Sequence, residues 1–201
     1  FTGKGYDLRT TEKNIQLYNQ LSGRAGRFSK DSTIVYQTIN PNNQILKNSE
    51  CTVHVIGEGV MCIEFQTKGN SIGEGIAKGI NEAIDIAERD GWNGIVIGNN
   101  EKQFSVGANL MNMGMMAMQK NFDEIEKFLV GFQKILMRMR TCNVPVVSAT
   151  HGFVMGGGLE VSIHCDAGIH ASESYIGLVE AGVGLIPGGG GTKEMAMRAS
   201  D

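Results

Sequence analysis

The chain has 201 residues, with 18 lysines and arginines against 21 aspartates and glutamates, so its formal net charge is −3. That balance gives no electrostatic reason to expect nucleic acid, and no apolar run approaches the roughly 18 residues of a membrane span. Glycine is frequent at 28 residues, yet 41% of the chain is hydrophobic, which excludes a flexible linker and allows a packed core.

The first section of the chain differs in composition from the rest. Residues 1–48 are polar and turn-rich, and we expect a linker or the tail of a preceding domain, with one possible strand at 34–39. The chain opens on Phe1 and stops soon after a helical pattern begins, which predicts a fragment of a longer protein. Residues 49–201 are then one domain, incomplete at its C-terminus. Four cysteines without a CxxC pair are typical of reduced thiols in a cytoplasmic protein.

The ordered part begins with strand patterns and then alternates. The runs 52–56 and 60–65, separated by Gly57-Glu58-Gly59, predict a hairpin. An apolar face at i+3 and i+4 spacing predicts a helix from Ser71 to Asp90, with Gly91 as its C-cap. A buried strand at 94–98, a helix at 122–139 capped by Asn121, a strand at 144–149, a short helix at 156–165 and a strand at 167–171 follow. This order predicts an α/β fold.

Glycines gather in the loops that follow these strands. Gly156-Gly157-Gly158 opens the short helix, where N–H groups lack partners and the helix dipole is positive. A second strand-to-loop junction at Gly107-Ala108 offers another amide, and two such amides form an oxyanion hole. Glu160 and Glu180 could supply acid–base chemistry beside it. The alternative is that the glycines allow tight packing and that both glutamates are solvated. Residue patterns alone leave the two readings open.

Three ordered motifs carry a resemblance to a known family. FSVGANL, then GFVMGGGLE, then the glutamate of YIGLVEAGVGLIPGGGGT resemble the enoyl-CoA hydratase (crotonase) superfamily over about residues 51–201. The resemblance implies a crotonase-like spiral of ββα units whose C-terminal helical part is truncated here. The sequence around these motifs is similar to that of the hydratase domain of bacterial multifunctional 3-hydroxyacyl-CoA dehydrogenase/enoyl-CoA hydratase proteins of fatty-acid β-oxidation.

The resemblance also implies roles for particular residues. Ala108 and Gly157 would hold the thioester oxygen through their amides, and Glu160 and Glu180 would be the catalytic pair. The implied substrate-binding residues are Phe104, Ser105, Val106, Gly107, Gly156, Gly158 and Gly188. The presence of both glutamates favours hydration of a 2-trans-enoyl-CoA. An isomerase or another crotonase activity, and a non-catalytic acyl-CoA-binding or assembly domain, remain as alternatives.

The same resemblance implies the wider setting. The substrate would be an acyl-CoA, with no cofactor in this domain and NAD only in a covalently linked upstream dehydrogenase domain. A trimer-type homo-oligomer in the cytoplasm is expected. The histidines and cysteines match no zinc spacing, so no metal site is predicted. The methionine-rich stretch at 111–118 is either an ordinary packed helix or an adaptable wall for an acyl chain.

Overall fold

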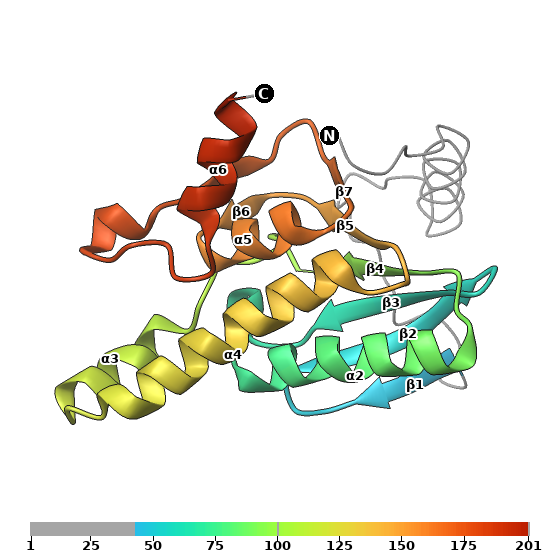
Figure 1. Cartoon of the computed structure of the whole chain (residues 1–201), viewed down its shortest axis with the longest axis horizontal. Helices are drawn as coiled ribbons and strands as arrows, with labels where there is room; N and C mark the ends of the chain where they lie inside the picture. The colour runs from blue at the N-terminus through green and yellow to red at the C-terminus, as the bar shows by residue number, and fades with distance from the viewer. Residues whose placement is uncertain (1–42, 100, 201) are drawn as a thin grey trace. The chain divides into compact units, whose positions relative to one another are not determined.

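The computed structural model describes residues 43–99 and 101–200, and its elements confirm the α/β alternation (Figure 1). The strands are β1 (Gln44–Lys47), β2 (Cys51–Gly57), β3 (Val60–Phe65), β4 (Gly94–Gly98), β5 (Val146–Thr150), β6 (Phe153–Met155), β7 (Ala167–His170) and β8 (Tyr175–Gly177). The helices are η3 (Lys68–Asn70), α2 (Glu74–Asp90), α3 (Leu110–Met118), α4 (Phe122–Thr141), α5 (Gly157–His164), η4 (Glu180–Val183) and α6 (Gly191–Ser200).

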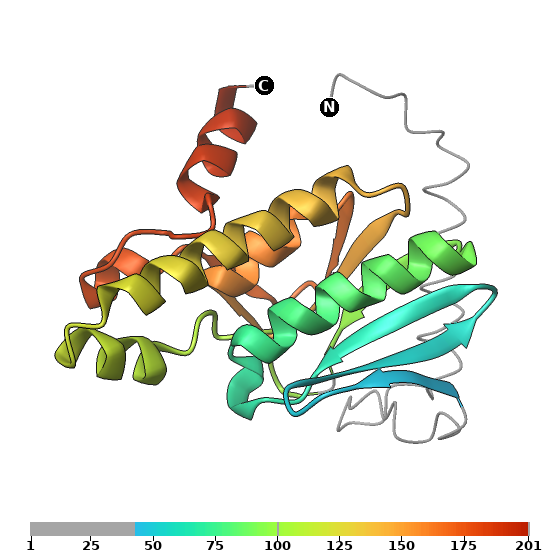
Figure 2. The same cartoon turned by 60° about the horizontal axis from the view of Figure 1, so that its bottom comes forward.

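The main sheet has the order β1-β2-β3-β4-β5-β7. Its first three strands pair antiparallel, and β3, β4, β5 and β7 run parallel. Because the parallel strands are added in one direction, right-handed crossovers bring the connecting helices to one face. Figures 1 and 2 show α2 and α4 side by side over that face. The loops that follow β4 and β5 therefore begin at the same edge of the main sheet.

Helix α2 shows how the sequence pattern becomes packing. Ile76, Ile80 and Ile84 recur every four residues, and all three are buried. They pack against the strands of the hairpin, as the 3.6-residue period requires. The helix ends at Gly91, whose φ of +72° is the left-handed cap that glycine supplies. The predicted helix is confirmed, although it begins at Glu74 and not at Ser71.

A small second sheet lies beside the main one and was not predicted. Strands β6 and β8 pair in parallel, and an isolated bridge joins Ser105 to Val154 of β6. Phe153 and Tyr175 cover its outer side with rings in edge-to-face contact at 5.7 Å between centroids. This sheet connects the loop after β4 to the segment that begins α5.

Two further expectations differ from the structure. Strand β1 lies within the segment predicted as a linker and pairs with β2, so the folded unit includes at least Gln44. Asn121 precedes α4 as expected, but its side chain makes no capping hydrogen bond; Asn109 does cap α3, accepting from the Asn112 N–H at 3.2 Å. The possible strand at 34–39 lies outside the described residues.

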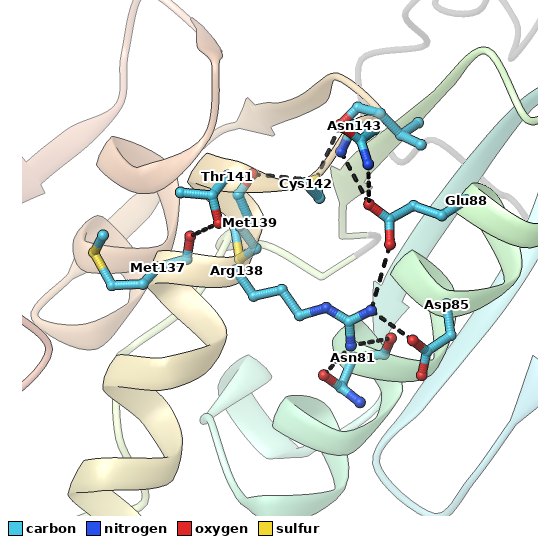
Figure 3. Close-up of polar contacts among 10 residues, drawn as sticks. Asn81, Asp85, Glu88, Met137, Arg138, Met139, Thr141, Cys142 and Asn143 are labelled. Atoms are coloured by element: carbon cyan, nitrogen blue, oxygen red, sulfur yellow. Dashed lines mark hydrogen bonds and ion pairs between the residues drawn. The ribbon is translucent and has the colours of Figure 1, made fainter.

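Helices α2 and α4 are joined by a polar network near the end of α4 (Figure 3). Arg138 of α4 donates to Asp85 of α2 at 2.5 Å and to the side chain of Asn81, and it lies 3.6 Å from Glu88. Glu88 also accepts from the backbone and side-chain amides of Asn143. This network ties two helices of the layer that covers the sheet.

Candidate active site

Two loops that are far apart in sequence meet next to the small sheet. The N–H of Phe104 donates to His151 O at 2.9 Å, and Ser105 exchanges backbone hydrogen bonds with Phe153 and Met155 at 3.0 Å each. Asn99, directly after β4, fixes the other side of the same loop by donating to Phe104 O at 2.5 Å. The residues after Ser105 are therefore held against the segment that leads into α5.

The meeting point brings two backbone amides together. A β-carbon on Gly157 would lie 3.3 Å from Ala108 N, and one on Gly107 would lie 3.1 Å from Gly157 N. Gly107 has a φ of +90°, which is strained for any residue with a side chain. Among the residues that the structure describes, none accepts a hydrogen bond from Ala108 N–H or Gly157 N–H. Both donors are thus available to a ligand.

The position of Gly157 strengthens this pair of donors. Gly157 begins α5, where the first N–H groups have no partner within the helix. The partial positive charge of a helix N-terminus favours an anionic oxygen. Two amides fixed by the backbone, one of them at such an end, can stabilise an oxyanion without reorganisation.

Glu160 stands one turn into α5 and is buried, with 2% of its surface exposed. Its Oε1 accepts from the N–H groups of Gly189 and Gly191, each at 2.8 Å. Burial raises the pKa of Glu160 above its ordinary value, the charge of Glu180 adds to that rise, and the two amide donors oppose it. The carboxylate is therefore held in place in a setting that favours uptake of a proton.

Two of the four glycines at 188–191, Gly189 and Gly191, lie against Glu160. A β-carbon on Gly189 would lie 2.6 Å from Glu160 Oε2, and one on Gly191 would lie 3.0 Å from Oε1. Only residues without side chains allow this approach of backbone to carboxylate. Gly188 is held by Gln133, whose Nε2 donates to Gly188 O at 2.6 Å.

Glu180 reaches the same region from the other side. It begins η4, and its Oε1 would lie 2.9 Å from a β-carbon on Gly156. Its Oε2 is buried and has no hydrogen-bond partner among the described residues. A buried acceptor without a partner is a place for a donor such as water. The structure thus places Glu180 against Gly156, the residue before the free amide of Gly157, and Glu160 one turn further along α5.

The remaining predicted site residues fall into two groups. Phe104 and Ser105 are fully buried: the ring of Phe104 is part of the core, and the Ser105 hydroxyl donates to Asn70 O at 2.7 Å and accepts from Gly107 N at 3.1 Å. Their side chains support the loop from beneath. Val106 is 43% exposed and lies on the loop's outer side.

Several functional supports were missed by the sequence reading. Asn99 links β3 to the loop, with its Oδ1 accepting from Phe65 N at 2.7 Å. The one feature of the sequence that could have pointed to Asn99 is the presence of an asparagine directly after a buried strand. Arg140 of α4, which is 33% exposed, and the buried Glu194 of α6 form an ion pair, and no local pattern pointed to it. The spacing of residues along the chain does not show which side chains of separate helices will come into contact.

The same part of the chain, residues 43–99 and 101–200, contains no cluster of three metal-ligating side chains. No helix in it is long and apolar enough to span a bilayer. Its four cysteines form no disulfide with one another, and three of them are buried.

Comparison with known proteins found relatives over most of the described chain. A sequence model of the enoyl-CoA hydratase/isomerase family matches residues 55–199. A protein of Bacillus subtilis (strain 168) named "Probable 3-hydroxyacyl-CoA dehydrogenase" is 42% identical over 151 residues, which are 75% of this chain and 19% of that protein. The fatty acid oxidation complex subunit alpha of Psychrobacter sp. (strain PRwf-1) is 28% identical over 152 residues, covering 74% of this chain and 21% of the relative.

A solved structure shows the same fold. The crystal structure of an enoyl-CoA hydratase from Polaromonas sp. JS666 matches with a TM-score of 0.70 and 23% identity, over 73% of this chain and 58% of that one. The expected crotonase-like architecture is therefore confirmed. The chain spans about a fifth of the length of the two curated relatives named above.

Proposed function

The chain belongs to the enoyl-CoA hydratase/isomerase family, and from that premise we propose that it adds water to 2-trans-enoyl-CoA thioesters. One observation carries the proposal. The free amides of Ala108 and Gly157 lie side by side, the buried Glu160 follows Gly157 in the same helix, and Glu180 lies against Gly156. That set of groups fits a reaction that develops negative charge on a carbonyl oxygen and moves protons nearby.

In the proposed reaction the thioester oxygen accepts from Ala108 N–H and Gly157 N–H. When the water oxygen bonds to Cβ, the C=C electron pair moves toward the carbonyl and the oxygen gains enolate character. Each amide then stabilises the transition state more than the substrate, and removal of one such donor typically costs about 3 kcal/mol.

Glu160 and Glu180 move the protons. One water proton goes to the carboxylate pair and one proton is delivered from the pair to Cα, so the pair keeps its total number of protons. The unpartnered Oε2 of Glu180 and the anchored carboxylate of Glu160 support this shared role. The raised pKa of Glu160, which burial causes, suits a group that must hold a proton near neutral pH.

The product suggests the neighbouring activity. Hydration leaves a hydroxyl group on C3, which is the group that a 3-hydroxyacyl-CoA dehydrogenase oxidises with NAD. The name and the greater length of the Bacillus subtilis relative support a natural chain in which both activities are covalently linked. A homo-oligomer and a cytoplasmic location remain predictions.

The test follows the loss of enoyl-thioester ultraviolet absorbance after crotonyl-CoA is added to the full natural chain. Glu160→Gln and Glu180→Gln should each lower kcat by about a hundredfold or more. Glu126→Gln, an exposed position on α4, is the matched control and should retain the rate. An unchanged rate in both site variants would refute the hydratase assignment.

A second substrate separates the family's other reaction. If the chain instead shifts the double bond, a 3-enoyl-CoA will be converted to its 2-enoyl isomer faster than crotonyl-CoA is hydrated. Binding of the thioester without turnover of either substrate would mark a non-catalytic acyl-CoA-binding domain.

A further inference from the structure

Helix α6 is attached to the rest of the fold mainly by polar groups. Only Gly191 and Glu194 are buried within it, while Met195 and Met197 are exposed. Apolar packing therefore contributes little to its position. Its first residue, Gly191, is one of the two donors to Glu160, so the position of this helix decides whether that hydrogen bond forms.

A buried carboxylate supplies the attachment. Glu194 lies in the first turn of α6 and is 3% exposed. Arg140 of α4 donates to both of its oxygens, from Nη1 to Oε1 at 2.8 Å and from Nη2 to Oε2 at 2.6 Å. Parallel donation from a guanidinium fork fixes orientation as well as distance.

Both partners are connected to the end of α5. Arg140 Nη2 also donates to Ile163 O at 3.3 Å, and Arg198 of α6 donates to the same oxygen at 3.0 Å. His164 Nδ1 donates to the backbone oxygen of Glu160 at 2.7 Å, and its Nε2 lies 3.7 Å from Glu194 Oε1. The ion pair, the end of α5 and the backbone of Glu160 therefore form one contiguous group.

We propose that Arg140 and Glu194 are positioning residues for Glu160. Their ion pair holds the first turn of α6 in the place where the N–H groups of Gly189 and Gly191 reach the Glu160 carboxylate. Only the catalytic consequence rests on the proposed function; the positioning itself is a statement about structure.

The consequence for Glu160 has a defined sign. Burial and the charge of Glu180 raise its pKa, and the two glycine donors lower it. Loss of the ion pair lets these donors move away, so the pKa rises further and the carboxylate loses its fixed orientation. The charged or titratable groups around the Arg140–Glu194 ion pair also include His164, Lys193, Asp166 and Arg198. Lys193 Nζ lies 2.8 Å from Glu194 Oε1.

The direct test is hydrogen exchange by mass spectrometry on the full natural chain, read in a peptide that covers residues 188–191. In Arg140→Gln we expect the amides of this peptide to exchange at least about tenfold faster, because an opened turn no longer has Glu160 as acceptor. Arg140→Lys keeps the charge without the fork and should give an intermediate rate.

The molecule offers a matched control two residues earlier. Arg138 lies on the same helix, is similarly exposed (29% against 33%) and also pairs with carboxylates, but those belong to α2 (Figure 3). Arg138→Gln should leave exchange at 188–191 unchanged. Equal exchange in the Arg138 and Arg140 variants would overturn the proposal.

Two further variants distinguish loss of the ion pair from general misfolding. Glu194→Gln removes the same ion pair from its other side and should reproduce the faster exchange. The double variant Arg140→Glu with Glu194→Arg restores opposite charges and should recover protection at least in part. Slow exchange in Glu194→Gln, or no recovery in the double variant when it is folded by circular dichroism, also contradicts the proposal.

The activity readout separates this proposal from the hydratase assignment. In Arg140→Gln, kcat on crotonyl-CoA should fall about tenfold with KM within roughly twofold, and the limb of the pH profile that depends on Glu160 should move upward by about one pH unit. If the unmodified chain does not hydrate crotonyl-CoA, the proposed function fails while the exchange result still decides the positioning. An active chain whose pH profile is identical in both arginine variants contradicts the catalytic consequence.

Discussion

Gly158 and Ser105 are in such close contact that a β-carbon on Gly158 would lie 2.7 Å from the Ser105 Cβ. The contact joins the first turn of α5 to the loop that carries Ala108, because the Ser105 hydroxyl also accepts from Gly107 N. The separation of the two free amides thus depends on the close approach of Gly158 to Ser105.

Gly158→Ala should therefore destabilise the chain by about 1–3 kcal/mol, because the added methyl group would meet the backbone oxygen and the buried side chain of Ser105. The urea midpoint measures this. The control is Gly131→Ala in α4, another helical glycine, around which nothing lies within 4 Å of the new carbon. There alanine should stabilise by roughly 0.5–1 kcal/mol. Equal shifts in the two variants would contradict the packing argument.

Gly107→Ala tests whether catalysis depends on the position of the Ala108 amide. Its φ is +90° and its β-carbon would lie 2.8 Å from Met155 O, so Ala108 N–H must move. We expect a loss of about 10²–10³ in kcat on crotonyl-CoA, comparable to the removal of one oxyanion donor.

Gly57→Ala is the control for this loss, because its φ is +108° and nothing lies within 4 Å of the added carbon. It should share the conformational cost of a positive φ and keep kcat. A similar loss of kcat in both variants would show that general destabilisation, and not the position of Ala108, is responsible.

The coupling of the two carboxylates predicts a shift in titration. Because the charge of Glu180 contributes to the raised pKa of Glu160, Glu180→Gln should lower that pKa toward its ordinary value. The amide proton shifts of Gly189 and Gly191, which donate to Glu160, report its titration in an NMR pH series. A Glu160 pKa that rises or stays unchanged in Glu180→Gln would contradict this interaction between the two carboxylates.

Glu194 predicts how acid affects stability. Hydrogen bonds from Arg140 lower the pKa of Glu194 from 4.5 to about 2. A carboxyl whose pKa is depressed on folding contributes stability above its ordinary value and loses that contribution as the pH falls toward 2. We expect a contribution on the order of 2 kcal/mol at neutral pH.

Glu194→Gln should therefore be less stable than the unmodified chain at pH 7 and differ progressively less from it between pH 4.5 and 2. Urea midpoints across that range measure the difference. A gap between the two chains that stays constant down to pH 2 would show that this carboxyl does not titrate with folding.

Much of the main sheet was predictable, because its signals are local. The β-type runs at 52–56 and 60–65, the four-residue apolar repeat of α2 and the wholly apolar run of β4 are each visible in a short stretch of sequence. The short strands escaped prediction for the opposite reason. Strands β6 and β8 have three residues each and expose Phe153, Tyr175 and Ile176, so no periodicity marks them. Their partner strands are distant in sequence.

The candidate site divides in the same way. Glu160 and the glycines beside it stand in one loop and one helix, so the sequence shows their spacing directly, and the family resemblance then implied their roles. The pairing of Arg140 with Glu194 joins positions 54 residues apart, and neither residue stands in a motif. Such contacts arise only when α4, α5 and α6 are packed, so a pattern search along the chain cannot detect them.

The proposed anion site consists of peptide groups, and this affects how the gene can vary. A point mutation can delete a side-chain donor, but every residue except proline brings its own N–H to position 108 or 157. The two donors can therefore be displaced but hardly removed, and sequence change at these positions acts through shape. The carboxyl groups of Glu160 and Glu180 have no such protection. Descendants of this chain could thus exchange one acid–base group for another while the oxygen-binding half of the site persists.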